Sequence, residues 1–205
     1  MRKIIKSAEP QSLTRFRKSH PRKWEEVHLP ANHSVYQDCI DQCRTDQNNL
    51  CGYTEIHLPH TAATHIDHYL KRDLFPKDTF EWGNLIAAIH DSHFGADWKD
   101  NCSHLKKSDY QQLINPVTDE LNGRFQYSTD GTIEPADPND TKASHTIRIF
   151  NLNADQLKAL RKNVMLTVRS LIEGGLSREE IINFLSAKGM PSVIDYELQY
   201  AVPKL

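Results

Sequence analysis

The chain has 205 residues, a formal net charge of −2 and a hydrophobic content of 38%. This length and composition allow one sizeable hydrophobic core and exclude a disordered polyelectrolyte. No stretch approaches the roughly 20 apolar residues of a membrane helix, and no apolar run follows the basic N-terminus as in a secretory signal. We therefore expect a cytoplasmic protein with reduced cysteines.

Residues 1–30 are predicted to form a basic N-terminal arm with a short helix near 12–16. Glu9 is the single acidic residue among the first 23, which also contain Arg2, Lys3, Lys6, Arg15, Arg17, Lys18, Arg22 and Lys23. The rest of the chain is acidic, because the total charge is slightly negative. A basic arm indicates contact with an anionic partner such as nucleic acid, a solvated basic surface, or docking on the acidic body itself.

Residues 31–121 are expected to form the central unit. The spacing of Val35, Cys39, Ile40 and Cys43 favours a helix within 33–50. Pro76, Gly83 and Gly95 punctuate the segment 51–94, which predicts strands or loops first and a helix from about Asn84.

Residues 122–205 are predicted to form a small β-hairpin and C-terminal helices that pack on the central unit. Asp130-Gly131 is typical of a hairpin turn, and 145–150 (HTIRIF) alternates like a strand. Apolar residues at helical spacing over 157–172 predict a helix that stops at Gly174-Gly175. Ser177 to Glu180 form a capping box for a second helix, which ends near Gly189. The fold class expected is α+β and mainly helical.

Five of the eleven histidines fall within residues 60–93: His60, His65, His68, His90 and His93. Metal-assisted phosphodiester cleavage needs a carboxylate and an imidazole on one cation, and a separate imidazole that takes a proton from water. Asp67 and His68 are adjacent and supply a carboxylate and a base. His93 on a following helix supplies the second ligand, and Asn84 is placed to tie down the loop that carries His68.

An Asp-His pair, an Asn-Leu pair and a later histidine resemble the pattern of HNH nucleases. The flanking segments MRKIIKSAEP, CGYTE, HIDHYLKR, EWGNL and TIRIFNLN are similar to one subfamily, the PtuB nucleases of Septu anti-phage defence and their retron-associated relatives. The resemblance implies a ββα-metal core with His68 as general base and Asp67 and His93 as ligands of Mg²⁺ (or Mn²⁺). It also implies Asn84 as a structural residue, His65 as a weaker site residue, and Lys71, Arg72 and Lys99 as nucleic-acid contacts.

Many HNH proteins hold this motif with four cysteines on a structural zinc. Here Cys51 matches, but Thr54, Ile89 and Ser92 stand at the other positions. One thiolate does not make a tetrahedral zinc site, so we expect no structural zinc and apolar packing around Ile89 in its place.

The resemblance implies a DNA endonuclease that acts as effector of an anti-phage complex with an ABC/SMC-like ATPase (PtuA). An acidic body neutralises few phosphates, which gives a physical reason for a partner that supplies DNA affinity. Two alternatives remain: an HNH nuclease that cleaves RNA such as tRNA, and a non-catalytic assembly subunit of the same complex.

Overall fold

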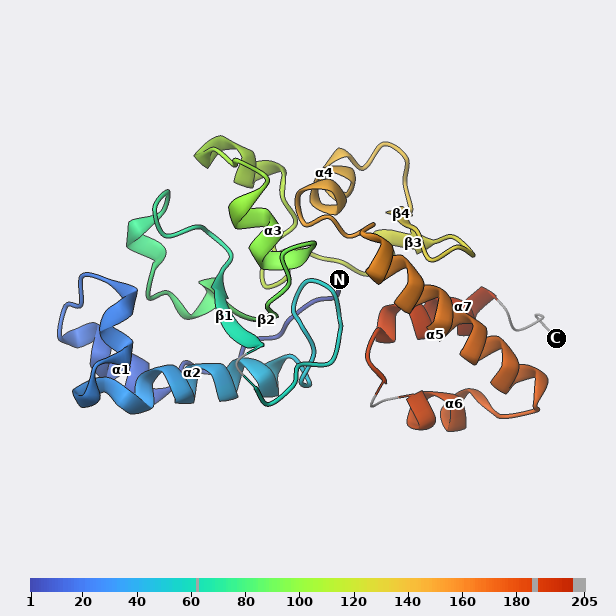
Figure 1. Ribbon diagram of the computed structural model, residues 1–205, viewed down its shortest axis with the longest axis horizontal. Helices are drawn as coiled ribbons and strands as arrows, with labels where there is room; N and C mark the ends of the chain where they lie inside the picture. The colour runs from blue at the N-terminus through green and yellow to red at the C-terminus, as the bar shows by residue number, and fades with distance from the viewer. Residues whose placement is uncertain (62, 186–187, 201–205) are drawn as a thin grey trace.

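Helices make up most of the regular structure in this computed structural model, which describes residues 1–61, 63–185 and 188–200. The architecture is α+β, with two small antiparallel sheets of two strands each. Figure 1 shows α5, α6 and α7 grouped at one end of the long axis, with α1 and α2 at the other. The α-helices are α1 (Gln11–Lys18), α2 (His33–Asp46), α3 (Gly95–Asn101), α4 (Thr141–Ile149), α5 (Asp155–Glu173), α6 (Arg178–Leu185) and α7 (Pro191–Tyr200). The strands are β1 (Thr64–His68), β2 (Leu85–Ile89), β3 (Phe125–Tyr127) and β4 (Ile133–Pro135), and short 3₁₀ turns include Trp24–His28 and Lys107–Gln112.

The N-terminal 30 residues pack onto the body of the protein. Leu13, Phe16 and Trp24 are buried in the main core. The Lys6 ammonium lies over the Trp82 ring and donates to the Leu85 carbonyl, and Arg17 pairs with acidic side chains. The arm therefore packs on the protein itself, while its other basic side chains Arg15, Lys18, Arg22 and Lys23 are exposed.

The first hairpin pairs β1 with β2, and His65 lies opposite Ala88 while Asp67 lies opposite Ile86. The prediction of a helix from Asn84 is wrong, because Leu85–Ile89 form β2 and the helix begins only at Gly95. The run LIAAI is too short and too uniformly apolar to distinguish a buried strand from a helix by periodicity. Antiparallel pairing with β1 stabilises this segment as a strand.

The segment predicted as a strand at 145–150 is helical in the structure and belongs to α4. The Asp140 carboxylate accepts a hydrogen bond from the Ala143 amide and caps this helix at its start. Ala143, Ile147 and Phe150 are buried at helical spacing. The cap and this buried face stabilise a helix, although the alternation of polar and apolar residues in HTIRIF predicted a strand.

The second hairpin, α5 and the capping box before α6 lie where the sequence predicted them. The β3–β4 hairpin turns at Gly131, and α5 spans the expected apolar stripe. Ser177 and Glu180 exchange the hydrogen bonds of the capping box ahead of α6. Helix α7 was not predicted; it packs with α5 and α6 around a small second core of Val168, Ile181, Leu185, Ile194 and Leu198. No helix in the described part of the chain is both long enough and apolar enough to cross a membrane.

Replacing Gly131 with Ala is expected to lower the free energy of unfolding by about 3 kcal/mol. Gly131 has a φ of 87°, and an added Cβ would lie 2.0 Å from the Lys158 carbonyl oxygen. Gly123→Ala is the matched control, since its φ is 69° but nothing lies within 4 Å of the added atom. Urea unfolding should show a cost of about 1 kcal/mol for the control. Equal costs for the two variants would contradict the close contact with α5.

Candidate metal and nucleic-acid site

The candidate site is built on β1, β2 and α3, which follow one another along the chain and pack together. Side chains alternate across a strand, so His65 and Asp67 share one face of β1 while Ile66 and His68 share the other. Asp67 and His65 both contact residues of α3, Lys99 and Asp97 respectively. In this ββα arrangement, the face of β1 that carries His65 and Asp67 is therefore directed at α3.

Asp67 is buried and both of its carboxylate oxygens contact cationic or hydroxyl groups. The Lys99 ammonium lies 2.9 and 3.2 Å from the two oxygens, and the Tyr53 hydroxyl donates to one of them. Burial alone would raise the pKa of the Asp67 carboxyl, but Lys99 and Tyr53 outweigh it and hold the pKa below its ordinary value. Asp67 is thus an ionised carboxylate whose charge is already neutralised.

Lys99 is fully buried, which departs from the predicted role as a phosphate contact. Its ammonium also donates to the main-chain oxygens of His68 (2.9 Å) and Tyr69 (3.3 Å). Desolvation would lower the pKa of Lys99, yet the neighbouring carboxylates raise it above its ordinary value. A buried ammonium surrounded by oxygens binds the end of β1 and has no access to a nucleic acid.

The predicted metal pair of Asp67 and His93 does not fit a divalent cation in this structure. The Lys99 ammonium occupies the oxygens that Asp67 would offer, and a second cation beside it would be repelled. His93 is 65% exposed, and its Nδ1 lies 3.0 Å from a carboxylate oxygen of Asp91. No cluster of three or more metal-ligating side chains in the described residues includes either of them.

His68 is buried at the end of β1 and its ring orientation is fixed. Its Nε2 donates to the Thr79 carbonyl oxygen at 3.0 Å, and Trp24 packs edge-on with a centroid distance of 4.6 Å. A carbonyl can only accept, so this bond places the proton on Nε2 and leaves Nδ1 unprotonated. Burial lowers the pKa of His68 to about 4, so the imidazole is neutral at physiological pH.

Asn84 holds together the loop between β1 and β2. Its Oδ1 accepts from the Leu70 amide at 2.7 Å, and its Nδ2 donates to the carbonyls of Leu70 (3.2 Å) and Asp78 (2.9 Å). The loop carries Thr79, the residue that orients His68. Asn84 therefore positions His68 through the loop and does not itself contact it.

We expect Asn84→Ala to lower the free energy of unfolding by about 2 to 4 kcal/mol, because it leaves the Leu70 amide and carbonyl without their partner and removes one of the two hydrogen bonds to the Asp78 carbonyl. Asn139→Ala removes an exposed asparagine that bonds only Asp137 and serves as the control. Thermal melts of both variants measure the effect. A loss in Asn84→Ala no larger than in the control would show that the loop does not depend on these bonds.

A second group of potential metal ligands contains His65 and two residues that no sequence motif links to it. One ligand atom each from His65, His90 and Asp97 lie within 4.8 Å of one another. The two imidazole rings stack with a centroid distance of 3.7 Å, and His90 Nδ1 lies 3.1 Å from Asp97. Burial is the main reason that the pKa of His65 lies below its ordinary value. His65 comes from β1, His90 follows β2, and Asp97 lies in the first turn of α3.

A cleft of about 580 Å³ opens beside this group and is lined by Tyr36, Asp41, Arg44, His60, His65 and His90, among others. Arg44 is 5% exposed and donates to the carbonyls of Leu58 and Pro59. Its Nε has no hydrogen-bond partner among the described residues, and neither has Nδ1 of His65. Buried donors without partners usually indicate a missing ligand or water.

The other predicted nucleic-acid contacts already have partners within the protein. The Lys71 ammonium donates to the Asp100 carbonyl at 3.0 Å. Arg72 pairs with Glu25 at 2.7 Å, with both side chains well exposed. An exposed pair of this kind contributes little to stability, so Arg72 is free to exchange Glu25 for a phosphate.

The four positions compared with the zinc cysteines of many HNH proteins hold a mixed set of side chains. Cys51 and Thr54 are buried, Ile89 is half-buried and packs on the core, and Ser92 is exposed. All four cysteines of the chain are free thiols. Ile89, the last residue of β2, packs against the main core.

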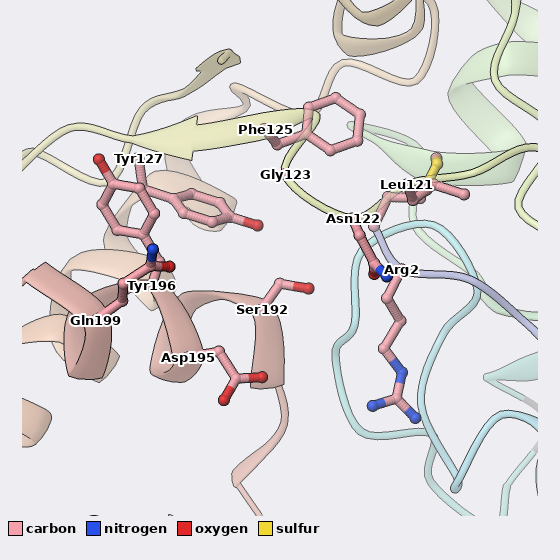
Figure 2. A pocket seen from close by; sticks show the side chains of 11 residues that line it. Arg2, Leu121, Asn122, Gly123, Phe125, Tyr127, Ser192, Asp195, Tyr196 and Gln199 are labelled. Carbon is pink, nitrogen blue, oxygen red and sulfur yellow. The ribbon is translucent and has the colours of Figure 1, made fainter.

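A separate pocket of about 210 Å³ lies between β3 and α7. Figure 2 shows Phe125 and Tyr127 on the strand side, with Ser192 and Tyr196 on the helix side and Arg2 nearby. Within the described ranges it contains no metal-ligating cluster. The chemistry-bearing residues are therefore those of the ββα region.

No family model matches the chain, and no curated protein matches it either. The function of the chain is therefore inferred from the geometry of the site and from the resemblance of its sequence motifs to those of HNH nucleases.

Proposed function

We propose that this chain is a metal-dependent endonuclease with an HNH-type ββα core, which cleaves phosphodiester bonds in DNA. The observation that supports it most is the β1–β2–α3 arrangement, with His68 at the end of β1 and Asn84 bracing the intervening loop. Phosphodiester hydrolysis requires a proton acceptor that is neutral at physiological pH. The imidazole of His68 meets that requirement, because burial lowers its pKa to about 4, and its bond to the Thr79 carbonyl leaves Nδ1 unprotonated.

The cleft supplies features that suit an anionic substrate. Arg44 carries a positive charge, and His60 and His90 offer further donors. A divalent cation, when bound, neutralises charge on the scissile phosphate and the leaving oxygen. In this proposal His68 is the general base, and Arg44 and His60, which line the cleft, bind phosphates of the substrate.

We further propose that the nuclease works as the effector subunit of an anti-phage complex with an ABC/SMC-like ATPase (PtuA). Lys3, Lys6 and Arg17 of the N-terminal segment are engaged within the protein, and the remainder of the chain is acidic, which supports a partner that supplies DNA affinity. Apolar side chains on α5 and α6, Leu166 and Phe184 above all, are more than half exposed and support a partner contact on these helices.

A second candidate function is a non-catalytic assembly subunit of the same complex. The specific observation in its favour is the Lys99 ammonium on Asp67, which neutralises a carboxylate that a nuclease would offer to a metal. RNA cleavage is the third possibility, because the geometry of the site does not select the sugar.

The test compares the full chain with and without the ATPase on plasmid DNA and on tRNA, in Mg²⁺, Mn²⁺ and Zn²⁺. The proposal predicts metal-dependent cleavage of plasmid DNA that increases with the partner. Cleavage of tRNA alone would reassign the substrate to RNA. No cleavage under any of these conditions, with the complex still formed, would support the assembly subunit and contradict the nuclease.

A further inference from the structure

We propose that His65, His90 and Asp97 bind one divalent transition-metal ion of the Zn²⁺ class at the mouth of the histidine-lined cleft. For its catalytic role this site rests on the proposed nuclease function. Its existence depends only on the three side chains and is testable by binding alone.

The three ligands come from separate elements that the fold brings together. Each supplies one atom, and these atoms lie within 4.8 Å of one another. Metal–nitrogen bonds of about 2.1 Å draw tetrahedral ligand atoms to roughly 3.4 Å apart, so the site forms when one stacked ring rotates and the ligand atoms move inward. His90 is 50% exposed and can rotate away from its stacked position, whereas His65 is 17% exposed and is held on β1.

The donor set points to a transition metal. Imidazole nitrogens suit Zn²⁺, Co²⁺ and Ni²⁺, whereas Mg²⁺ prefers carboxylate, carbonyl and water oxygens. Two imidazoles and the single carboxylate of Asp97 offer only one anionic oxygen ligand. The expected ion is therefore of the Zn²⁺ class, in place of the Mg²⁺ that the family resemblance implies.

The pleat of β1 explains why the site lies at His65 and not at Asp67. The two side chains share a face two residues apart, and both contact α3. The Lys99 ammonium occupies the Asp67 end of this face, whereas the His65 end has the Asp97 carboxylate beside two imidazole rings. A mobile cation is thus repelled from one end of this face and attracted to the other.

Two features leave the site open toward a ligand. Three protein ligands occupy three of four tetrahedral positions, which is the pattern of a catalytic and not a structural zinc centre. His65 and His90 both line the cleft, and so does Arg44, whose Nε is buried without a partner. A phosphate group entering the cleft therefore meets a surface lined by both histidine ligands and by Arg44.

The experiment uses the full chain after chelator treatment, titrated by calorimetry with Zn²⁺, Co²⁺ and Mg²⁺. We expect one Zn²⁺ per chain, bound at least about 10-fold more tightly than Mg²⁺, and visible absorption of bound Co²⁺ typical of a four-coordinate site. His90→Ala and Asp97→Asn should each weaken Zn²⁺ binding by at least about 10-fold. His90 is half exposed, so its variant is expected to fold normally.

His93→Ala is the matched control, since His93 is an exposed histidine three residues from His90. Its affinity for Zn²⁺ should equal that of the unmodified chain. Absence of saturable Zn²⁺ binding, or loss of binding in His93→Ala but not in His90→Ala, would overturn the site. Zn²⁺ binding without cleavage of any nucleic acid would leave the site in place and contradict the nuclease function alone.

Discussion

Replacing Lys99 with Met is expected to lower the free energy of unfolding by about 3 to 5 kcal/mol. Methionine fills a similar volume but removes the ammonium, so the buried carboxylate of Asp67 keeps its charge without a cation. The His68 and Tyr69 carbonyls lose a donor at the same time. Urea unfolding followed by circular dichroism measures the change as a shift of the midpoint with an unchanged slope.

The double variant Asp67→Asn with Lys99→Met separates charge from packing. It removes both charges, and we expect it to recover at least half of the loss, because the uncompensated charge dominates the cost. Lys162→Met changes an exposed lysine of α5 and should stay within about 0.5 kcal/mol of the unmodified protein. A loss below about 1 kcal/mol for Lys99→Met would mean that water reaches Asp67.

The same pair predicts the direction of a pH effect. The pKa of Asp67 is lowered in the folded state, so its contribution is present above the ordinary pKa of about 4 and is lost as pH falls further. The double variant lacks this group. Its stability should therefore fall less steeply than that of the unmodified protein in strongly acidic solution.

Replacing His68 with Ala is expected to lower the rate of phosphodiester cleavage by about 10² to 10⁴-fold, the usual contribution of a general base. His68 is 7% exposed and packs against Trp24, so folding of the variant must be checked by thermal melting. His68→Asn keeps a polar side chain and should lose activity to a similar extent. His57→Ala, which removes an exposed histidine outside the cleft, is the control and should remain fully active.

The lowered pKa of His68 gives this prediction a second readout. A base works in its neutral form, and His68 has a pKa of about 4. The rate should consequently stay flat from neutral pH down to about pH 5 and fall as pH approaches 4. An inflection near 6.5, the ordinary histidine value, would show that His68 is not the base.

The sequence predicted the α+β class, and the pattern of Asp67-His68 and Asn84 drew attention to the segment that forms the first hairpin. It did not predict the partner of Asp67. The position at which α3 begins decides which of its residues contacts that carboxylate. The helix was expected from about Asn84, but β2 occupies that segment and α3 begins only at Gly95.

The same reason explains why the group around His65 was missed. His90 was expected within a helix that ran through His93, but it follows a strand, and its amide donates to the Ala63 carbonyl. Asp97 belongs to no motif and reaches His65 only because α3 packs on the hairpin. Proximity between residues on three elements is a property of packing, which local periodicity does not encode.

The most direct test of the metal site proposed for this ββα core is the anomalous scattering of zinc in crystals of the full chain soaked with Zn²⁺. We predict a single strong peak bonded to His65, His90 and Asp97, with Lys99 still paired to Asp67. A peak bonded to Asp67 and His93, with the Lys99 ammonium displaced, would contradict the proposed site and restore the ligand pair implied by the family resemblance.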